Sequence, residues 1–192
     1  MGQLYYGDNL DILRRKIQTE TVDLSYIDPP FNSKRNYNQI YNNIGKEDRA
    51  QAQAFTDTWI WDDYAAEGYF EIFSPSNSNR FNTRTVELIK GLRAVLKEGS
   101  LLAYLVHMTL RITEIHRVLK PTGSFYLHCD PTSSHYLKLI LDGIFVAGGA
   151  TSSTKLFGVI AMEERASGIL EENTTQSFII ANPVTIFLTV TR

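Results

Sequence analysis

The chain has 192 residues, of which 43% are hydrophobic and 21% are charged, and its formal net charge is −2. This composition is typical of a globular chain that buries one core, and the charge lacks the basic excess of a dedicated nucleic-acid-binding protein. The single cysteine, Cys129, excludes an internal disulfide, so we expect a cytoplasmic protein in a reducing compartment. No basic-then-apolar leader and no bilayer-length apolar stretch is present, so neither export nor membrane insertion is expected.

The first segment predicts a short strand at residues 4–6 followed by an amphipathic helix at residues 10–17. Gly7 lies in the turn between them, and Asp8 or Asn9 is the expected helix cap because short polar side chains accept hydrogen bonds from the first helical amides. This order, strand then turn then helix, is the usual start of a βαβ unit.

A second strand is expected at residues 22–27, which are rich in β-forming side chains. The strand must end at Asp28 because Pro29 and Pro30 cannot join a hydrogen-bonded ladder. Asp28 is therefore predicted at the carboxyl end of a strand. In open α/β sheets this edge is where ligands bind.

Residues 32–82 form a polar, aromatic and turn-rich stretch, which we interpret as a long irregular insertion. Its aromatic residues Trp59, Trp61, Tyr64 and Tyr69 are expected to form a small satellite core, the alternative being a base-stacking surface. Residues 44–79 are net acidic and residues 80–120 are net basic. We interpret the basic stretch as solvated faces of helices.

Helical spacing of apolar residues predicts amphipathic helices at residues 86–96 and 105–119, separated near Gly99. An apolar strand is expected at residues 124–129. A helix capped by Thr132 or Ser133 then runs to Phe145. Alternating strands and helices predict an α/β fold with a mainly parallel sheet. The β-like runs at residues 177–181 and 184–191 cannot be placed in that sheet from the sequence.

The tetrapeptide Asp28-Pro29-Pro30-Phe31 carries the chemistry that the sequence suggests. An exocyclic base amine is a poor nucleophile because its lone pair is delocalised into the ring. The Asp28 carboxylate and the Pro29 carbonyl would accept its two hydrogens and direct the lone pair at an electrophile. Phe31 would stack on a base removed from the duplex. Taken alone, such a tetrapeptide is more often a simple strand-ending turn, and its context supports the functional interpretation.

Four stretches together resemble the DNA amino-methyltransferases (adenine-N6 or cytosine-N4) in the permuted, β-class-like arrangement, where the catalytic motif precedes the cofactor glycine motif. They are YGDNL at residues 6–10, YIDPPFN at 26–32, QAFTDTW at 53–59 and RVLKPTGSFYLHCD at 117–130. The resemblance implies a Rossmann-like, mostly parallel methyltransferase sheet and S-adenosyl-L-methionine as cofactor. It also implies a flipped base held by residues 28–31, with the methionine part of the cofactor near Asp28 and Asp8 on the cofactor side of the cleft.

One departure from the family pattern sets the expected domain organisation. The family places a Phe-x-Gly-x-Gly cofactor loop towards the C-terminus, whereas Gly148 and Gly149 follow Phe145 at the wrong spacing. We therefore expect an incomplete sheet, with a catalytic region at residues 1–145 and an atypical tail at 146–192. We also expect a fragment that is weakly active or inactive alone.

Several assignments remain as alternatives. Lys34 and Arg35 are expected to contact DNA phosphates, although a basic pair in a loop is often only solvated. The spacing of the four histidines matches no compact metal site, and Cys129 is expected to be a buried structural thiol. Asp130 would either line the cleft or cap the following helix, and His128 is expected to be a core or pocket-wall residue.

The favoured function is site-specific DNA methylation of the restriction-modification or orphan type. The expected partners are DNA and a restriction subunit. The alternatives are an RNA or protein-amide methyltransferase and a truncated remnant that binds DNA without activity. Asp rather than Asn at position 28 favours DNA as the substrate.

Overall fold

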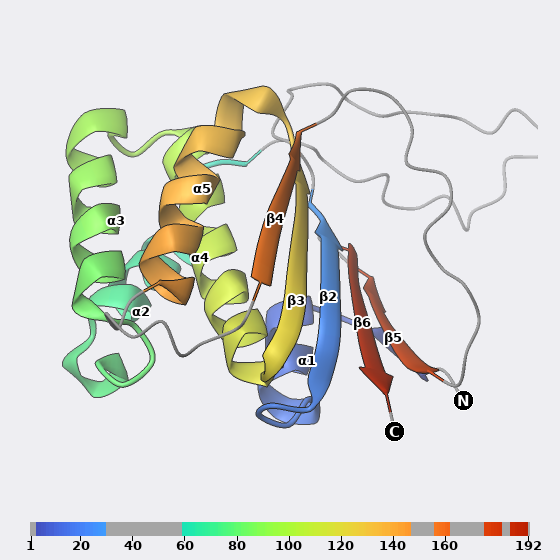
Figure 1. Cartoon of the computed structure of the whole chain (residues 1–192). Helices are drawn as coiled ribbons and strands as arrows, with labels where there is room; N and C mark the ends of the chain where they lie inside the picture. The colour runs from blue at the N-terminus through green and yellow to red at the C-terminus, as the bar shows by residue number, and fades with distance from the viewer. Residues whose placement is uncertain (1–2, 30–58, 147–155, 162–174, 182–184, 192) are drawn as a thin grey trace, which may run out of the picture.

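The computed structural model describes residues 3–29, 59–146, 156–161, 175–181 and 185–191. The strands form one six-stranded sheet in the order β1-β5-β6-β2-β3-β4, and the described helices form a layer on one of its faces (Figure 1). The strands are β1 (Gln3–Tyr6), β2 (Val22–Asp28), β3 (Leu119–Cys129), β4 (Leu156–Ala161), β5 (Thr175–Ala181) and β6 (Thr185–Thr191).

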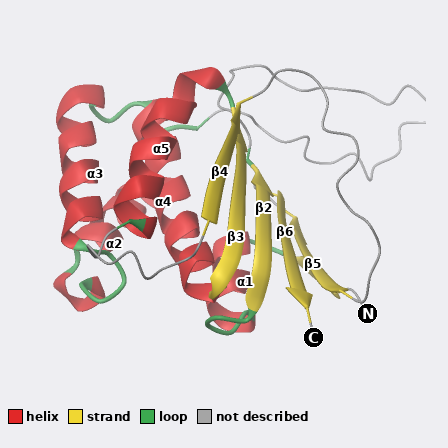
Figure 2. Ribbon diagram, in the orientation of Figure 1, coloured by secondary structure: helices red, strands yellow, loops and turns green. Residues whose placement is uncertain are grey.

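The sheet is mixed, as Figure 2 shows in a view coloured by secondary structure. The pairs β1/β5, β2/β3 and β3/β4 are parallel, whereas β6 runs antiparallel to both of its neighbours, β2 and β5. The α/β class expected from the sequence is confirmed. The strands of the C-terminal part, which could not be placed from the sequence, belong to this same sheet, and β4 was not predicted.

Five α-helices and one short 3₁₀ helix are described. They are α1 (Asn9–Lys16), α2 (Asp63–Phe73), η2 (Pro75–Asn77), α3 (Thr83–Leu96), α4 (Ser100–Val118) and α5 (Pro131–Phe145). The predicted helices are confirmed as elements, with boundaries that differ by a few residues, as is usual for helix ends.

Helix α2 corrects the expectation of an irregular insertion at residues 32–82, of which residues 32–58 lie outside the described part. The Asp62 side chain caps α2 by accepting a hydrogen bond from the Ala65 amide at 2.9 Å. Ala65, Tyr69 and Ile72 are buried at helical spacing, and α2 packs against α4. The aromatic and turn-forming residues around this short helix hid its period in the sequence.

Strand β3 begins at Leu119, five residues before the predicted start at position 124. Its pairing with β2 jumps from Val22–Leu119 to Leu24–Ser124, so the intervening residues bulge out of the ladder. Gly123 fits this bulge because a Cβ there would lie 3.0 Å from the carbonyl oxygens of Val22 and Lys120. The Pro-Thr-Gly sequence therefore interrupts the ladder locally without ending the strand.

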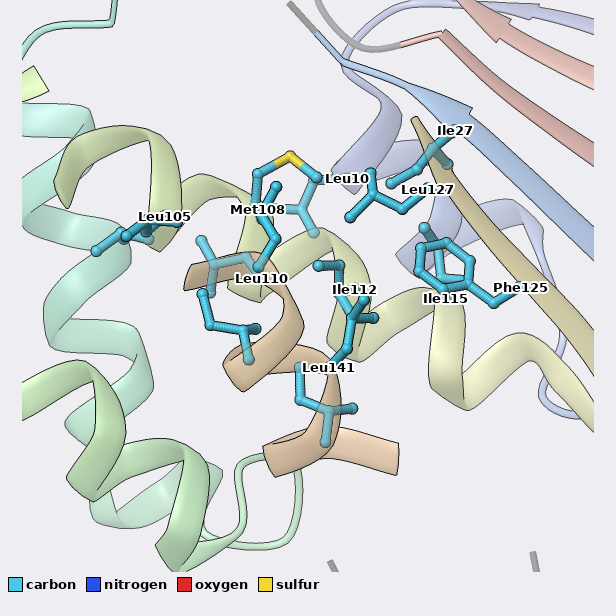
Figure 3. Close-up of a cluster of buried hydrophobic side chains, with 14 of the residues drawn as sticks. Leu10, Ile27, Leu105, Met108, Leu110, Ile112, Ile115, Phe125, Leu127 and Leu141 are labelled. Carbon is cyan, nitrogen blue, oxygen red and sulfur yellow. The ribbon is translucent and has the colours of Figure 1, made fainter. Parts of the chain in front are cut away.

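Helix α4 is central to the core and is buried on nearly all sides. Fifteen of its nineteen residues are buried, which corrects the predicted amphipathic stripe, because α1, α2, α3 and α5 all pack against it. Figure 3 shows its apolar side chains packed with others from α1, β2, β3 and α5; those labelled are Leu10, Ile27, Leu105, Met108, Leu110, Ile112, Ile115, Phe125, Leu127 and Leu141. None of the described helices is long and apolar enough to cross a membrane.

An ionic network joins the helices at the end of this core. The Glu114 side chain, 3% exposed, pairs with Arg80 and accepts a hydrogen bond from Arg117 Nε at 2.7 Å. Arg117 also donates to the carbonyls of Leu13 and Ile17 at the end of α1, at 2.8 and 3.2 Å. The interpretation of residues 80–120 as solvated basic faces is therefore wrong for Arg80 and Arg117, which pair with the buried Glu114, and for Arg111, whose side chain is 1% exposed.

Candidate active site at the carboxyl edge of the sheet

The strand directions bring three acidic residues to one edge of the sheet. Strands β2 and β3 are parallel. Strand β1 also runs in their direction, because it is parallel to β5, and β5 and β2 are both antiparallel to β6. Asp8 after β1, Asp28 at the end of β2 and Asp130 after β3 therefore lie along the same carboxyl edge. Ligands of open α/β sheets bind at this edge.

The Asp28 carboxylate is exposed, whereas the residues before and after it in the chain are buried. The Asp28 side chain is 46% exposed, whereas Ile27 before it and Pro29 after it are buried. The prediction that a strand ends at Asp28, directly before the two prolines, is confirmed. Pro30, Phe31, Lys34 and Arg35 lie outside the described residues, so their proposed contacts with base and DNA stay predictions.

His128 contacts Asp28 from the neighbouring strand. Ile27 pairs with Leu127, which places the next residue of each strand side by side, and His128 Nδ1 lies 2.9 Å from Asp28 Oδ1. When the carboxylate is ionised it can only accept hydrogen bonds, and Nδ1 is then the donor. Sequence reasoning placed His128 in the core or pocket wall and missed this contact, because the two residues are 100 positions apart.

Aromatic side chains share this face of the sheet. Tyr26 pairs with Tyr126, and strand alternation places both on the same face as Asp28 and His128. The pKa of Tyr26 is raised, first by burial and then by the negative charge of Asp28. The Asp28 carboxylate therefore contributes negative charge to the face of the sheet that carries Tyr26.

Asp8 is the N-cap of α1. Its Oδ1 accepts hydrogen bonds from the amides of Leu10 at 2.8 Å and Asp11 at 3.3 Å, and its side chain is 31% exposed. Gly7 before it has φ of 142°, a conformation that favours glycine. Asp8 thus fixes the start of α1 at the same edge as Asp28.

A buried arginine, which sequence reasoning did not single out, supports Asp8. Arg111 is 1% exposed and donates from Nη2 to Asp8 Oδ2 at 3.1 Å, from Nε to Asn9 Oδ1 at 2.6 Å and from Nη1 to the His107 carbonyl at 3.2 Å. The one sequence signal was a charged residue inside the apolar repeat of α4. Arg111 ties the β1–α1 turn to the central helix.

His107 lies between aromatic rings beside this arginine. Its ring centroid is 4.9 Å from that of Trp59 and 5.1 Å from that of Tyr64. Burial, and then the charge of Arg111, lower the pKa of His107 to about 4, against smaller opposing effects of nearby carboxylates. Trp59 also packs on Tyr104, with centroids 5.6 Å apart. Trp59 and Trp61 pack against the main core, which includes Tyr69, so the predicted satellite core is not separate from it.

The remaining candidates have structural roles in the described residues. Burial, and then the Asp130 charge, raise the pKa of the Cys129 thiol to about 11, so it is protonated near neutral pH. Asp130 caps α5 by accepting from the Ser133 amide at 3.0 Å, which confirms the capping role considered for it and corrects the predicted cap at Thr132 or Ser133. No three His, Cys, Asp or Glu side chains within the described segments gather as a metal site.

A sequence profile of the DNA methylase family (N6/N4 methyltransferases) matches residues 22–174. The chain belongs to this family. The match includes both strands that carry the Asp28–His128 pair, so the pair lies within the methylase region. Membership in this family implies a methyl donor.

The chain is also similar to the Mod subunit of the Type III restriction-modification enzyme StyLTI from Salmonella typhimurium strain LT2. The two are 28% identical over 145 residues, which are 74% of this chain and 18% of that subunit. The chain therefore spans less than a fifth of the length of this curated relative. No solved structure matches the chain significantly.

Proposed function

We propose that this chain carries the catalytic part of a site-specific DNA methyltransferase that methylates the exocyclic amine of adenine (N6) or cytosine (N4). The observation that carries the proposal is the half-exposed Asp28 carboxylate at the carboxyl end of β2, directly before Pro29 and inside the region that matches the methylase family. Open α/β sheets bind their ligands at the carboxyl ends of the strands, which is where this carboxylate lies.

The proposed role of Asp28 is to localise the lone pair of the target amine. Its carboxylate and the Pro29 carbonyl would each accept one amine hydrogen, which draws the nitrogen away from conjugation with the ring. Asp28 would also stabilise the positive charge that develops on the nitrogen. Pro30 would stiffen the turn and Phe31 would stack on the flipped base.

The proposed cofactor is S-adenosyl-L-methionine, which would supply an electrophilic methyl group on a sulfonium. The charge of the edge fits a cationic donor, because Asp8 and Asp28 both place carboxylates there. Asp28 fits best, since nearly half of its side chain is exposed. The Asp8 carboxylate already binds the α1 amides and Arg111, so its contribution is to shape the cofactor side of the site.

We further propose a Rossmann-like, mostly parallel methyltransferase sheet, with the catalytic region at residues 1–145 and an atypical tail at 146–192. The parallel β3–α5–β4 unit supports the Rossmann-like architecture. Lys34 and Arg35 are proposed as phosphate contacts. The likeness to a Mod subunit supports DNA as substrate, a restriction subunit as partner and the cytoplasm as location.

A labelled-methyl assay on DNA, RNA and protein substrates tests the proposal. This chain alone should transfer methyl groups to DNA weakly or not at all, and a full-length homologue should transfer them readily. Asp28→Ala should reduce transfer by the homologue, and any transfer by this chain, by at least ~100-fold while the fold is retained. Asp142→Ala, which removes an exposed carboxylate of α5, is the control. Near-normal turnover of Asp28→Ala would show that the amine-binding role is wrong.

Calorimetry of S-adenosylmethionine binding distinguishes an enzyme from an inactive remnant. A chain that binds S-adenosylmethionine but transfers only to RNA or protein belongs to a different substrate class. A chain that binds DNA but has no affinity for S-adenosylmethionine is the inactive remnant, and the proposed activity then fails for these 192 residues.

A further inference from the structure

We propose that His128 is a positioning residue for methyl transfer: its imidazole holds the Asp28 carboxylate in the orientation that receives the target amine. The inference rests on the proposed function, because it assigns to His128 a role that acts through Asp28. It is carried by the contact between two side chains at the same edge of the sheet, 2.9 Å apart.

The backbone register of β2 and β3 brings Asp28 and His128 together. Tyr26–Tyr126 and Ile27–Leu127 are consecutive register pairs of two parallel strands, and the next position holds Asp28 beside His128. Neighbours at one register position of adjacent strands point to the same face. The His128 side chain is only 17% exposed, so the imidazole is the restrained member of the pair and the half-exposed carboxylate is the member that needs support.

The hydrogen bond from His128 gives the two oxygens of the Asp28 carboxylate different roles. Oδ1 accepts from His128 Nδ1, and no other side-chain hydrogen bond to Asp28 is made by the described residues. Oδ2 is therefore the oxygen that can accept a hydrogen from a target amine. A carboxylate at a strand end would otherwise rotate about both of its side-chain bonds, and a displacement of about 1 Å at a reacting centre can cost on the order of 100-fold in rate.

The residues next to His128 cannot take its place. Cys129 is fully buried, on the opposite face of β3, and Asp130 is occupied as the cap of α5. Of these three consecutive residues, His128 alone contacts Asp28. Its Nδ1 is already committed to Asp28, so the geometry points to orientation of the acid as its role.

Kinetics of variants test the role. Under single-turnover conditions, which detect slow transfer, His128→Leu should lower the rate of methyl transfer to DNA about 10- to 100-fold while DNA affinity stays within about twofold. His128→Asn, whose amide can donate from near the Nδ1 position, should recover most of the rate. His135→Leu, a change at an exposed histidine of α5, is the matched control and should transfer normally.

An NMR measurement tests the geometry without activity. Long-range ¹H–¹⁵N spectra should show His128 in the Nδ1–H form, since the carboxylate requires a donor there, and Asp28→Ala should shift His128 toward the Nε2–H form. An Nε2–H form in the wild-type chain, or a normal transfer rate in His128→Leu, would overturn the inference.

The two proposals fail differently. Full activity of Asp28→Ala would remove the amine-binding role of Asp28, and the role of His128 with it, whereas a full-length homologue that transfers no methyl group to DNA would remove the proposed function itself. Loss of activity in Asp28→Ala together with normal activity in His128→Leu would remove only the role of His128. If the wild-type chain transfers no methyl group, the NMR tautomer decides whether the pair is built as proposed.

Discussion

Replacing Asp8 by Asn should destabilise the fold by leaving a buried positive charge without its counter-ion. The Arg111 guanidinium is 1% exposed, and within the described residues its ion pair is with Asp8. Asn caps a helix about as well as Asp does, so Asp8→Asn removes the charge while it keeps the start of α1. Asp8→Ala removes both the charge and the cap.

The magnitude follows from the burial of the two partners. Breaking a fully buried ion pair by removing one member costs about 3–5 kcal/mol. Asp8 is 31% exposed, and Arg111 keeps its hydrogen bonds to Asn9 and the His107 carbonyl, which reduces this cost. We expect the free energy of unfolding to fall by about 2–3 kcal/mol in Asp8→Asn. Asp8→Ala should lose about 1 kcal/mol more because the cap is lost as well.

A double-mutant cycle isolates the pair. Arg111→Met removes the buried charge with a side chain of similar length, so Asp8→Asn should cost much less in that background, with a coupling of at least ~1 kcal/mol. Urea unfolding followed by circular dichroism measures all four proteins. Asp11→Asn, at an exposed residue of the same helix, should stay within about 0.5 kcal/mol of wild type. Additive effects of Asp8→Asn and Arg111→Met would refute the reasoning.

Two further predictions concern buried titratable groups. The pKa of His107 is about 4 in the folded chain, below its ordinary 6.5, so the unfolded state takes up a proton first as the pH falls. Stability should therefore decrease between pH 6.5 and 4, by roughly 2–3 kcal/mol from this group, and urea titrations of His107→Phe should show a shallower decrease. An unchanged slope would contradict this assignment. Cys129 is fully buried and its pKa is about 11, so at pH 8 it should react with a thiol reagent such as DTNB only after denaturation, and rapid labelling of the native chain would contradict the structure.

The local parts of the site could be predicted from the sequence. Two prolines after a β-rich run place Asp28 at a strand's end, because proline cannot continue a ladder and its ring restricts the residue before it. Short polar side chains before a helical repeat predict a cap at Asp8 or Asn9, and Asp8 is the cap. Each of these features depends on neighbours within a few positions, and the structure confirms both.

The predictions from the sequence were wrong where tertiary packing overrides the local residue pattern. Helix α4 has charged residues among its apolar ones, and the sequence suggested one buried stripe. Four other helices pack around it, so that Arg111 and Glu114 are buried and must find partners on other elements. Nothing in the period of a helix tells which partner is within reach.

By itself the sequence determined the class of fold, the position of Asp28 and the family to which its motifs point, because strand ends, caps and motifs are written in adjacent residues. Only the tertiary structure decided that β6 lies between β5 and β2, that Arg111 holds Asp8 and that His128 reaches Asp28 across 100 residues. These pairings depend on strand order and register, which bring together side chains that share no local signal. The carboxylate proposed to bind the amine is therefore identified by its tetrapeptide, and its orientation is set by the neighbouring strand.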